Sequence, residues 1–351
     1  MWSEDSIFYE NLEDAVKVNF IPWEQMKDKT FLVTGGTGLI GSTLIRTILL
    51  ANKKYDLRIH IVAIVRNKER ASEKFAEELK GGALTFCMGS VENLPEIRGK
   101  INYIIHGASQ TISKEFVTHP VETIQTAITG TQNLLELAKE KSVEGFVYLS
   151  SMEMYGYPER GHKVTEDEAG ALSPLDLRNS YPISKQMCEA MCCAYASEYG
   201  IPAKIARLTQ TFGPGVNYND TRIFAYFGRC VIEKKNIVLK TKGETERCYL
   251  HSMDAATAIL AILLKGEFGR AYNCADESTY CSIAEMAEIV AKEGGISVEY
   301  DIQDAATNGF PKTLYMNLDT KLIKQLGWEP VFGGAIRTLY YSLINWLKLK
   351  K

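Results

Sequence analysis

A glycine-rich turn between a strand pattern and a helix pattern is the feature that most constrains the fold of this chain. Residues 30–34 (TFLVT) are apolar and largely β-branched, which predicts a buried strand. A turn follows directly, and apolar residues then recur at helical spacing from Leu39 to Leu50. Gly35, Gly38 and Gly41 give the turn the pattern GxxGxxG. A strand, a tight glycine turn and a helix in this order are typical of a dinucleotide-binding fold.

The missing Cβ atoms of these glycines explain the pattern. Gly35 allows the tight turn, Gly38 lets the backbone approach a pyrophosphate, and Gly41 lets the helix pack on the strand. The N-terminus of the helix then binds the anion. Ser42 stands where a Walker loop requires lysine, so a nucleotide-triphosphate loop is excluded. We expect NAD or NADP to contact Gly35, Thr37, Gly38, Leu39, Ile40 and Gly41.

Short apolar runs continue to alternate with helical segments along the chain. Such runs occupy residues 59–65, 83–89, 101–109, 145–151 and 203–213. Strands that are buried on both faces of a parallel sheet have this nearly continuous apolar pattern. The expected fold is therefore α/β, a doubly wound parallel sheet (Rossmann) with a smaller C-terminal α/β substrate lobe.

The regular alternation is lost after Pro214, which sets the expected domain boundaries. Residues 1–29 form an N-terminal extension to which we assign no function. Residues 30–213 form the dinucleotide-binding domain, and residues 250–280 return to it with a helix and a short strand. Residues 214–249 and 281–351 build the smaller lobe.

The composition excludes several classes of function. The chain has 351 residues, 46% hydrophobic and 24% charged, with a formal net charge of −3, and so offers no basic surface for nucleic acid. No apolar run is long enough to span a membrane, and the acidic N-terminus does not resemble a secretory leader. Eight cysteines without paired spacing fit a reducing compartment, so we expect a cytoplasmic protein. Cys188, Cys192 and Cys193 have no histidine at ligand spacing, and we expect them to pack rather than to bind metal.

Arg66 bears on the choice between the two nicotinamide cofactors. An NAD-specific fold usually ends its second strand with a carboxylate that accepts hydrogen bonds from the adenosine ribose. Here that strand ends in AIVRN, and Arg66 suits a 2′-phosphate instead. We therefore expect a preference for NADP.

Tyr181 and Lys185 are the candidate proton-transfer pair. They lie four residues apart, so on a helix they share one face. An ammonium close to a phenol favours the phenolate, and we expect Lys185 to lower the pKa of Tyr181. Ser151 and Glu153 lie at the end of the strand over residues 145–151, where doubly wound sheets bind ligands. We expect Ser151 to donate to the substrate oxygen that Tyr181 also addresses.

From about Thr30 onward the chain resembles the extended short-chain dehydrogenase/reductase family, in its nucleotide-sugar epimerase/dehydratase branch. The segments TGGTGLIG, IIHGAS, GTQNLLELA, YLSSMEMYG, YPISK, RLTQTFGPG, ERCYLHSMDAATAI and LGWEP carry the resemblance, in this order. The resemblance implies a nicotinamide cofactor in the first domain, near Ala108, and a nucleoside-diphosphate sugar in the smaller lobe. It also implies a catalytic triad of Ser151, Tyr181 and Lys185 that oxidises a sugar hydroxyl, usually at C4, to a 4-keto intermediate.

The resemblance also indicates which residues bind the sugar nucleotide. Arg247 matches a family arginine near the diphosphate, and Arg222 is a second candidate. Gln210 and Ala127 both stand where the family commonly has asparagine, and the longer Gln210 shifts the expected sugar pose. With Ser109, the expected substrate residues are Ser109, Gln210, Arg222 and Arg247.

The fate of the 4-keto intermediate depends on the residues after Ser151. Glu153 matches the base that removes the C5 proton in dehydratases, whereas Met152 cannot serve as an acid for a leaving hydroxyl. The pattern therefore leans toward a 4,6-dehydratase or a decarboxylase. A 4-epimerase, an NADPH-dependent keto-sugar reductase and a catalytically silent dinucleotide sensor stay open as alternatives. The helix that follows Tyr181 commonly forms a dimer bundle in this family, so we expect a homodimer.

Overall fold

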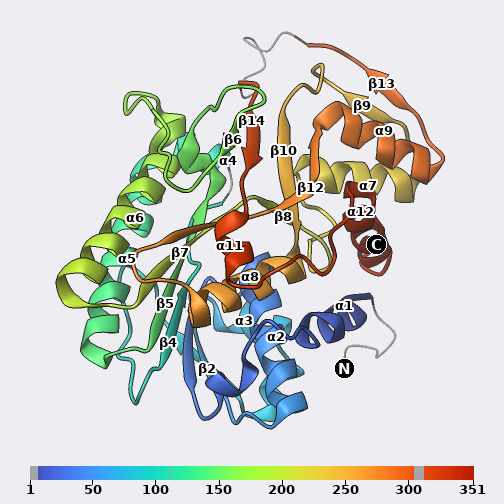
Figure 1. The fold of residues 1–351 in the computed structure, drawn as a ribbon. Helices are drawn as coiled ribbons and strands as arrows, with labels where there is room; N and C mark the ends of the chain where they lie inside the picture. The colour runs from blue at the N-terminus through green and yellow to red at the C-terminus, as the bar shows by residue number, and fades with distance from the viewer. Residues whose placement is uncertain (1–6, 112, 304–311) are drawn as a thin grey trace.

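The computed structural model describes residues 7–111, 113–303 and 312–351, and its main element is a parallel sheet (Figure 1). The strand order β11-β7-β5-β4-β1-β2-β3 reverses beside β1, which pairs with β2 on one side and β4 on the other. The strands are β1 (Thr30–Thr34), β2 (His60–Val65), β3 (Leu84–Met88), β4 (Tyr103–His106), β5 (Gly145–Ser151), β7 (Ala203–Leu208) and β11 (Ala271–Cys274).

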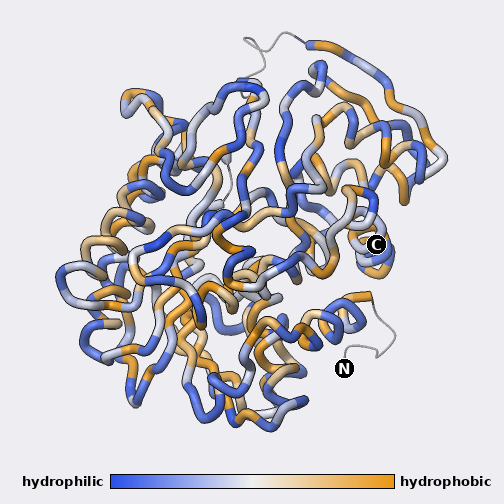
Figure 2. The backbone as a smooth tube through the Cα atoms, viewed as in Figure 1, coloured by the Kyte–Doolittle hydropathy of each residue, from blue (hydrophilic) through white to orange (hydrophobic). Residues whose placement is uncertain are grey.

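Helices cover both faces of this sheet. Alternate residues of β1 point to opposite faces, so Phe31 and Val33 join one apolar core and Leu32 joins the other. Helices α2 (Leu39–Tyr55) and α8 (Ser252–Lys265) complete the first core, whereas α5 (Pro120–Lys141) and α6 (Ser180–Tyr199) complete the second. Figure 2 shows apolar residues concentrated along the sheet strands. The expected doubly wound Rossmann fold is confirmed.

A smaller lobe contains the second sheet, of order β12-β10-β14-β6, with β8 paired to β10. Three helices enclose its core, and a two-stranded sheet of β13 and β9 lies beside them. The elements are β6 (Lys163–Val164), β8 (Gln210–Phe212), α7 (Ile223–Glu233), β9 (Ile237–Leu239), β10 (Glu246–His251), β12 (Asp276–Ser282), α9 (Ile283–Gly294), β13 (Val298–Tyr300), β14 (Tyr315–Leu318) and α12 (Ile336–Lys348).

The chain passes between the two parts at points that differ from the expected boundaries. It leaves the main sheet after Cys274, because β12 already pairs with β10. Helix α11 (Lys321–Gln325) lies within the segment expected for the lobe, yet Ile323 and Trp328 pack into the core of the main sheet. The boundary at residue 280 and the assignment of residues 321–328 are therefore corrected.

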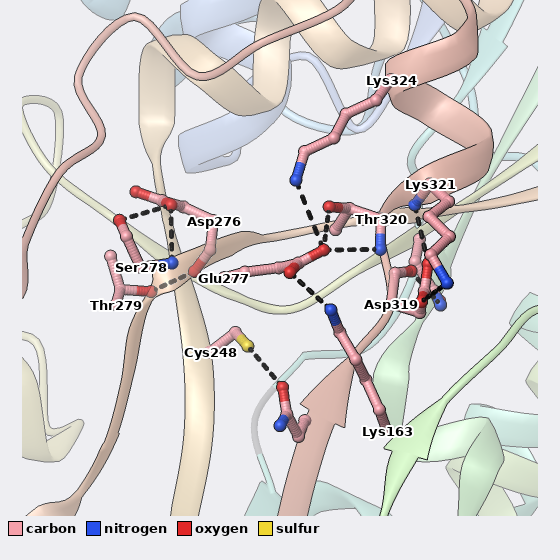
Figure 3. A network of polar contacts seen from close by, with 12 residues as sticks. Lys163, Cys248, Asp276, Glu277, Ser278, Thr279, Asp319, Thr320, Lys321 and Lys324 are labelled. Carbon is pink, nitrogen blue, oxygen red and sulfur yellow. Dashed lines mark hydrogen bonds and ion pairs between the residues drawn. The ribbon is translucent and has the colours of Figure 1, made fainter.

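Two further contacts join the lobe to the main domain. Helix α1 (Ile7–Val16) packs on α2 and α8, and Phe8 contacts Trp346 of α12 with ring centroids 5.4 Å apart. On another side, Glu277 of β12 accepts hydrogen bonds from Lys163 Nζ at 2.6 Å and from the Thr320 amide at 3.0 Å, next to α11 (Figure 3). In the described ranges no helix is both long and apolar enough to cross a membrane.

Candidate active site

A cleft of about 1400 Å³ opens at the carboxyl ends of the main-sheet strands and is also lined by residues of the smaller lobe. Strand order reverses between β1 and β4, and the loops that follow these two strands meet there. A Cβ on Gly35 would lie 2.5 Å from the Gly107 carbonyl carbon. The two loops are therefore in backbone contact beneath the cleft.

The glycine turn forms a cradle that a side chain would fill. Gly35 has a φ of +70°, and a Cβ on Gly41 would overlap the Gly35 carbonyl oxygen. Gly38 begins α2 at the cleft without a side-chain cap, and the first amides of a helix have no partner within it. This cradle fits the pyrophosphate of a dinucleotide. The cleft wall contains Gly35, Gly38, Leu39, Ile40 and Gly41.

Three other residues expected at the cofactor do not line the cleft. The Thr37 carbonyl accepts a hydrogen bond from Lys74 Nζ at 2.8 Å, and the Ala108 amide donates to Thr34 Oγ1 at 3.2 Å. Both residues shape the loops behind the wall. Arg66 is exposed directly after β2. Their cofactor contacts therefore stay predictions.

His106 holds the end of β4 in place. Its Nδ1 pairs with Thr34 Oγ1 at 2.8 Å and its Nε2 with Thr131 Oγ1 at 3.2 Å. Burial, with the charge of Lys185 nearby, lowers the pKa of His106 to about 3. A neutral, fully paired imidazole has a structural role here.

Tyr181 and Lys185 both reach the cleft from α6. Lys185 Nζ donates to the Leu149 carbonyl at 2.7 Å and lies 5.5 Å from the Tyr181 ring centroid. Burial lowers the pKa of Lys185 to about 8. The pair is thus assembled, with the ammonium directed at β5 rather than at the phenol oxygen.

The expectation that Lys185 lowers the pKa of Tyr181 is wrong in this structure. Burial is the main cause that raises the pKa of Tyr181 above its usual value, and the Glu153 carboxylate adds to the rise. A hydrogen bond from Ser151 and the charge of Arg178 oppose it. The Lys185 ammonium instead donates to the Leu149 carbonyl of β5.

Ser151 and Glu153 are positioned by the turn that ends β5. The 3₁₀ helix η3 (Met152–Tyr155) starts there, and Ser151 Oγ accepts from the Glu153 amide at 3.2 Å. Both side chains line the cleft beside Tyr181. The structure therefore brings together all four expected catalytic residues, although their roles stay predictions.

Sequence reasoning missed Arg178 and Phe116. Arg178 Nη2 pairs with Glu153 Oε2 at 2.9 Å, and its guanidinium lies 4.8 Å from the Phe116 ring centroid. The Phe116 ring in turn stacks on Tyr181 at 4.4 Å, with the ring planes 1° apart. Arg178 stands three residues before Tyr181, so a search for charges around the tyrosine would have found it. Nothing in the sequence around Phe116, in α4 (Ser113–Thr118), points to the site.

The expected substrate residues also line the cleft, on the side of the smaller lobe and of the loop after β4. Arg247 Nη1 donates to Gln210 Oε1 at 3.2 Å, while Arg247 Nε is buried without a partner among the described residues. Arg222 is paired with Asp220 at 2.6 Å, and Ser109 Oγ donates to the Gln110 carbonyl at 3.2 Å. A guanidinium in the wall of a cleft has N–H donors that suit an anion.

A buried ionic network lies beneath the turn that ends β5. Arg207 Nη2 pairs with Glu189 Oε2 at 2.7 Å, and the Ser150 hydroxyl donates to the same carboxylate. Arg207 Nη1 also donates to the Tyr155 hydroxyl at 2.7 Å. These contacts fix the turn that carries Ser151 and Glu153. In the part of the chain that the structure describes, no group of three or more His, Cys, Asp or Glu residues could hold a metal ion.

Comparison with known protein families decides the family. The profile of the NAD dependent epimerase/dehydratase family matches residues 31–275, which is more than half of the chain. The chain belongs to this family. As a family member it is an NAD(P)-binding enzyme, and the glycine cradle described above is where the cofactor fits.

Relatives within the family have several activities. The chain is 27% identical over 342 residues to the UDP-glucuronic acid decarboxylase 1 of Xenopus tropicalis, covering 95% of this chain and 77% of the relative. Among solved structures, a dTDP-glucose 4,6-dehydratase from Streptomyces venezuelae with NAD bound has a TM-score of 0.75 at 24% identity, covering 91% of this chain and 97% of that one. A UDP-glucuronic acid 4-epimerase from Bacillus cereus has a TM-score of 0.76 at 19% identity, covering 92% and 100%. These structural likenesses show a shared fold.

Proposed function

We propose that this family member converts a nucleoside-diphosphate sugar through a transient 4-keto sugar, by 4,6-dehydratase or decarboxylase chemistry. The observation that carries the proposal is the placement of Glu153 in the cleft, close enough to Tyr181 for its charge to raise the pKa of the phenol. A carboxylate next to the residue that takes the C4 hydroxyl proton is placed to move a proton at C5, the neighbouring carbon. The named activities of the decarboxylase and dehydratase relatives support the same chemistry.

Each side chain has a separate role in the proposed reaction. Tyr181, hydrogen-bonded by Ser151, takes the proton of the C4 hydroxyl. A nicotinamide cofactor held at the glycine turn of Gly35, Gly38 and Gly41 would supply hydride transfer at C4. Lys185 supplies positive charge beneath the site, and Glu153 transfers the proton at C5. Arg247 and Gln210 are the proposed diphosphate and sugar contacts, because both residues line the cleft on the side of the smaller lobe.

Mass spectrometry of intact nucleotide sugars tests this proposal. Purified enzyme is incubated with UDP-, dTDP-, GDP- and CDP-linked sugars and with NAD or NADP. Loss of water or carbon dioxide without net cofactor consumption is the expected result, and Tyr181→Phe is expected to abolish it. An isomer of unchanged mass would show an epimerase instead. Turnover only with a keto-sugar and consumed NADPH would show a reductase, and retained function in Tyr181→Phe would show a sensor.

We further propose that the cofactor is NADP rather than NAD. Arg66 follows β2, and Arg70 and Lys74 lie on the next helix, α3 (Lys68–Lys74). Burial, together with the nearby charges of Arg46 and Arg70, lowers the pKa of Lys74 to about 8. This local excess of positive charge suits a 2′-phosphate. Titration of cofactor-free protein is expected to show tighter binding of NADP, and Arg66→Asp is expected to remove the difference. Equal affinities in the unaltered protein would contradict the proposal.

We also propose a cytoplasmic homodimer. Helices α5 and α6 pack side by side and leave Val121, Ile124, Met187 and Tyr199 exposed, which favours a helical dimer interface. All eight cysteines lie in the described ranges and are unpaired, as expected in a reducing compartment. Light scattering after size exclusion is expected to give twice the monomer mass, and a monomer mass would contradict the dimer.

A further inference from the structure

Arg178 is a cation at the reacting end of the cleft, away from the residues proposed for the diphosphate. Arg222, Lys240 and Arg247 reach the cleft from the smaller lobe. Arg178 instead lies in the 3₁₀ helix η4 (Leu177–Asn179), directly before the helix that carries Tyr181. A neutral hexose presents only hydroxyl groups at that end. A guanidinium there indicates that the substrate carries a negative charge close to the reacting carbon.

The surroundings of Arg178 fix its position and leave part of it accessible. Its amide is capped by Asp176 Oδ1 at 2.9 Å, and its guanidinium rests on the Phe116 ring that stacks on Tyr181. The ion pair with Glu153 is monodentate, and the two side chains are 31% and 30% exposed. A guanidinium has five N–H donors in a planar fork, so Arg178 can bind a second carboxylate beside Glu153.

We propose that Arg178 binds the C6 carboxylate of a nucleotide-linked hexuronic acid, which makes this enzyme a decarboxylase. This inference rests on the proposed 4-keto chemistry and narrows its substrate class. The same guanidinium pairs with Glu153 before the substrate binds. Arg178 then shares its donors between Glu153 and the substrate, which weakens its binding of the C6 carboxylate and lets the carboxylate lose its charge as the reaction proceeds.

The reaction balances with groups already named. Oxidation at C4 turns the uronate into a β-keto acid, whose C5–C6 bond breaks to release carbon dioxide. The electron pair of that bond moves into the C4–C5 enolate, so negative charge leaves Arg178 and develops at the C4 oxygen beside Tyr181 and Ser151. A solvent proton delivered through Glu153 adds to C5, and return of the hydride to C4 gives the pentose and regenerates the oxidised cofactor. No further oxidant or reductant is required.

Binding measurements in the Tyr181→Phe background test Arg178 without turnover. UDP-glucuronic acid and UDP-glucose are titrated by calorimetry with oxidised cofactor present. We expect the uronate to bind at least about tenfold more tightly, since a charged hydrogen-bonded pair contributes about 1.5–3 kcal/mol. Arg178→Met should remove this gap and Arg178→Lys should restore part of it, because lysine keeps the charge but not the fork. Lys240→Met, which removes a cation at the lobe end of the cleft, should weaken both ligands equally.

The outcomes separate this inference from the proposed function. Equal binding of both ligands, or a gap that survives Arg178→Met, overturns the role of Arg178. The unaltered enzyme could instead dehydrate UDP-glucose and bind both ligands with equal affinity. That result overturns the uronate substrate, while it supports the 4-keto chemistry. A gap that Arg178→Met removes, in an enzyme that turns over neither ligand, supports the Arg178 site and contradicts the proposed function.

Discussion

The Glu153 carboxylate interacts with two neighbours in the cleft, Arg178 and Tyr181. Its amide donates to Ser151, its carboxylate pairs with Arg178, and its charge raises the pKa of Tyr181. In the free enzyme the Glu153 carboxylate therefore opposes formation of the Tyr181 phenolate, while the Ser151 hydrogen bond and the charge of Arg178 favour it. The state of the active site is therefore coupled to the pairing of Glu153.

Glu153→Gln is expected to lower kcat by about 100-fold or more, because an amide cannot transfer the C5 proton. The same change should leave Arg178 without its ionic partner and lower KM for an acidic substrate. Steady-state kinetics, in which the reaction product is separated by chromatography, measure the changes in kcat and in KM. Glu159→Gln, at an exposed loop position, is the matched control and should change neither. Unaltered kcat in Glu153→Gln would show that the carboxylate only contacts the substrate.

At the residue scale the sequence singled out residues that the structure brings into one cleft, but not their electrostatics. Ser151, Tyr181 and Lys185 occur in recognisable local patterns, and the structure places them in one cleft. The pKa of Tyr181 depends on burial and on Arg178 and Glu153, whose proximity is set by tertiary packing. Helical spacing alone placed Lys185 near the phenol, while the carbonyl of Leu149 in β5 determines where its ammonium points.

Among the elements, the junction of β1 and α2 depends most on the glycines. Gly41 packs against the backbone of Gly35 and Gly36, where a Cβ has no room to move. A Cβ on Gly38 would have more room, because its nearest neighbour, the Gly35 carbonyl oxygen, would lie 3.3 Å away. The two glycines thus have different functions within one turn.

Gly41→Ala is expected to cost about 1–3 kcal/mol of unfolding free energy, because the backbone must shift to remove the overlap. Gly38→Ala is the matched control, expected to keep the stability and to weaken cofactor binding by crowding the approach to the pyrophosphate. Denaturant unfolding and fluorescence titration with NAD and NADP measure the two effects. Equal stability losses in both variants would contradict the assigned roles.

The sequence predicted buried strands better than it predicted the short strands of the smaller lobe. The strands of the main sheet are short and, apart from the edge strand β3, apolar and largely buried. Their alternation with helices identified the fold from residues 30–213. The smaller lobe contains β6, β8 and β9, which are two or three residues long and carry no periodic pattern. Their positions are set by pairing with distant strands, as in the contact of β8 with β10, which a local pattern does not record.

At the scale of the whole molecule, Glu277 forms polar contacts where the smaller lobe meets the main domain. It accepts from Lys163 and Thr320 and lies 3.4 Å from Lys324 Nζ (Figure 3). Hydrogen bonds from these groups outweigh the effect of burial and lower the pKa of Glu277 to about 2. Because the folded pKa lies below its ordinary value, this contribution to stability is complete above about pH 4.5 and is lost as the pH falls toward 2.

Glu277→Gln is therefore expected to lower the unfolding free energy by about 1.5–3 kcal/mol at pH 7, with a smaller difference near pH 3. Chemical denaturation at both pH values measures the change. Glu96→Gln is the control, since Glu96 is 72% exposed in its pair with Arg98 and should contribute almost nothing. A pH-independent loss in Glu277→Gln would contradict the ionic explanation.

The late position of β11 in the sequence has a consequence for biosynthesis. All residues of β7 are buried, yet the strand that covers its outer edge lies at residues 271–274, beyond β8, β9 and β10. During synthesis β7 therefore remains an open sheet edge while more than sixty further residues, from the smaller lobe and from α8, leave the ribosome. Such an edge is a site for mispairing and aggregation, so the yield of this enzyme should depend on chaperones that shield nascent chains.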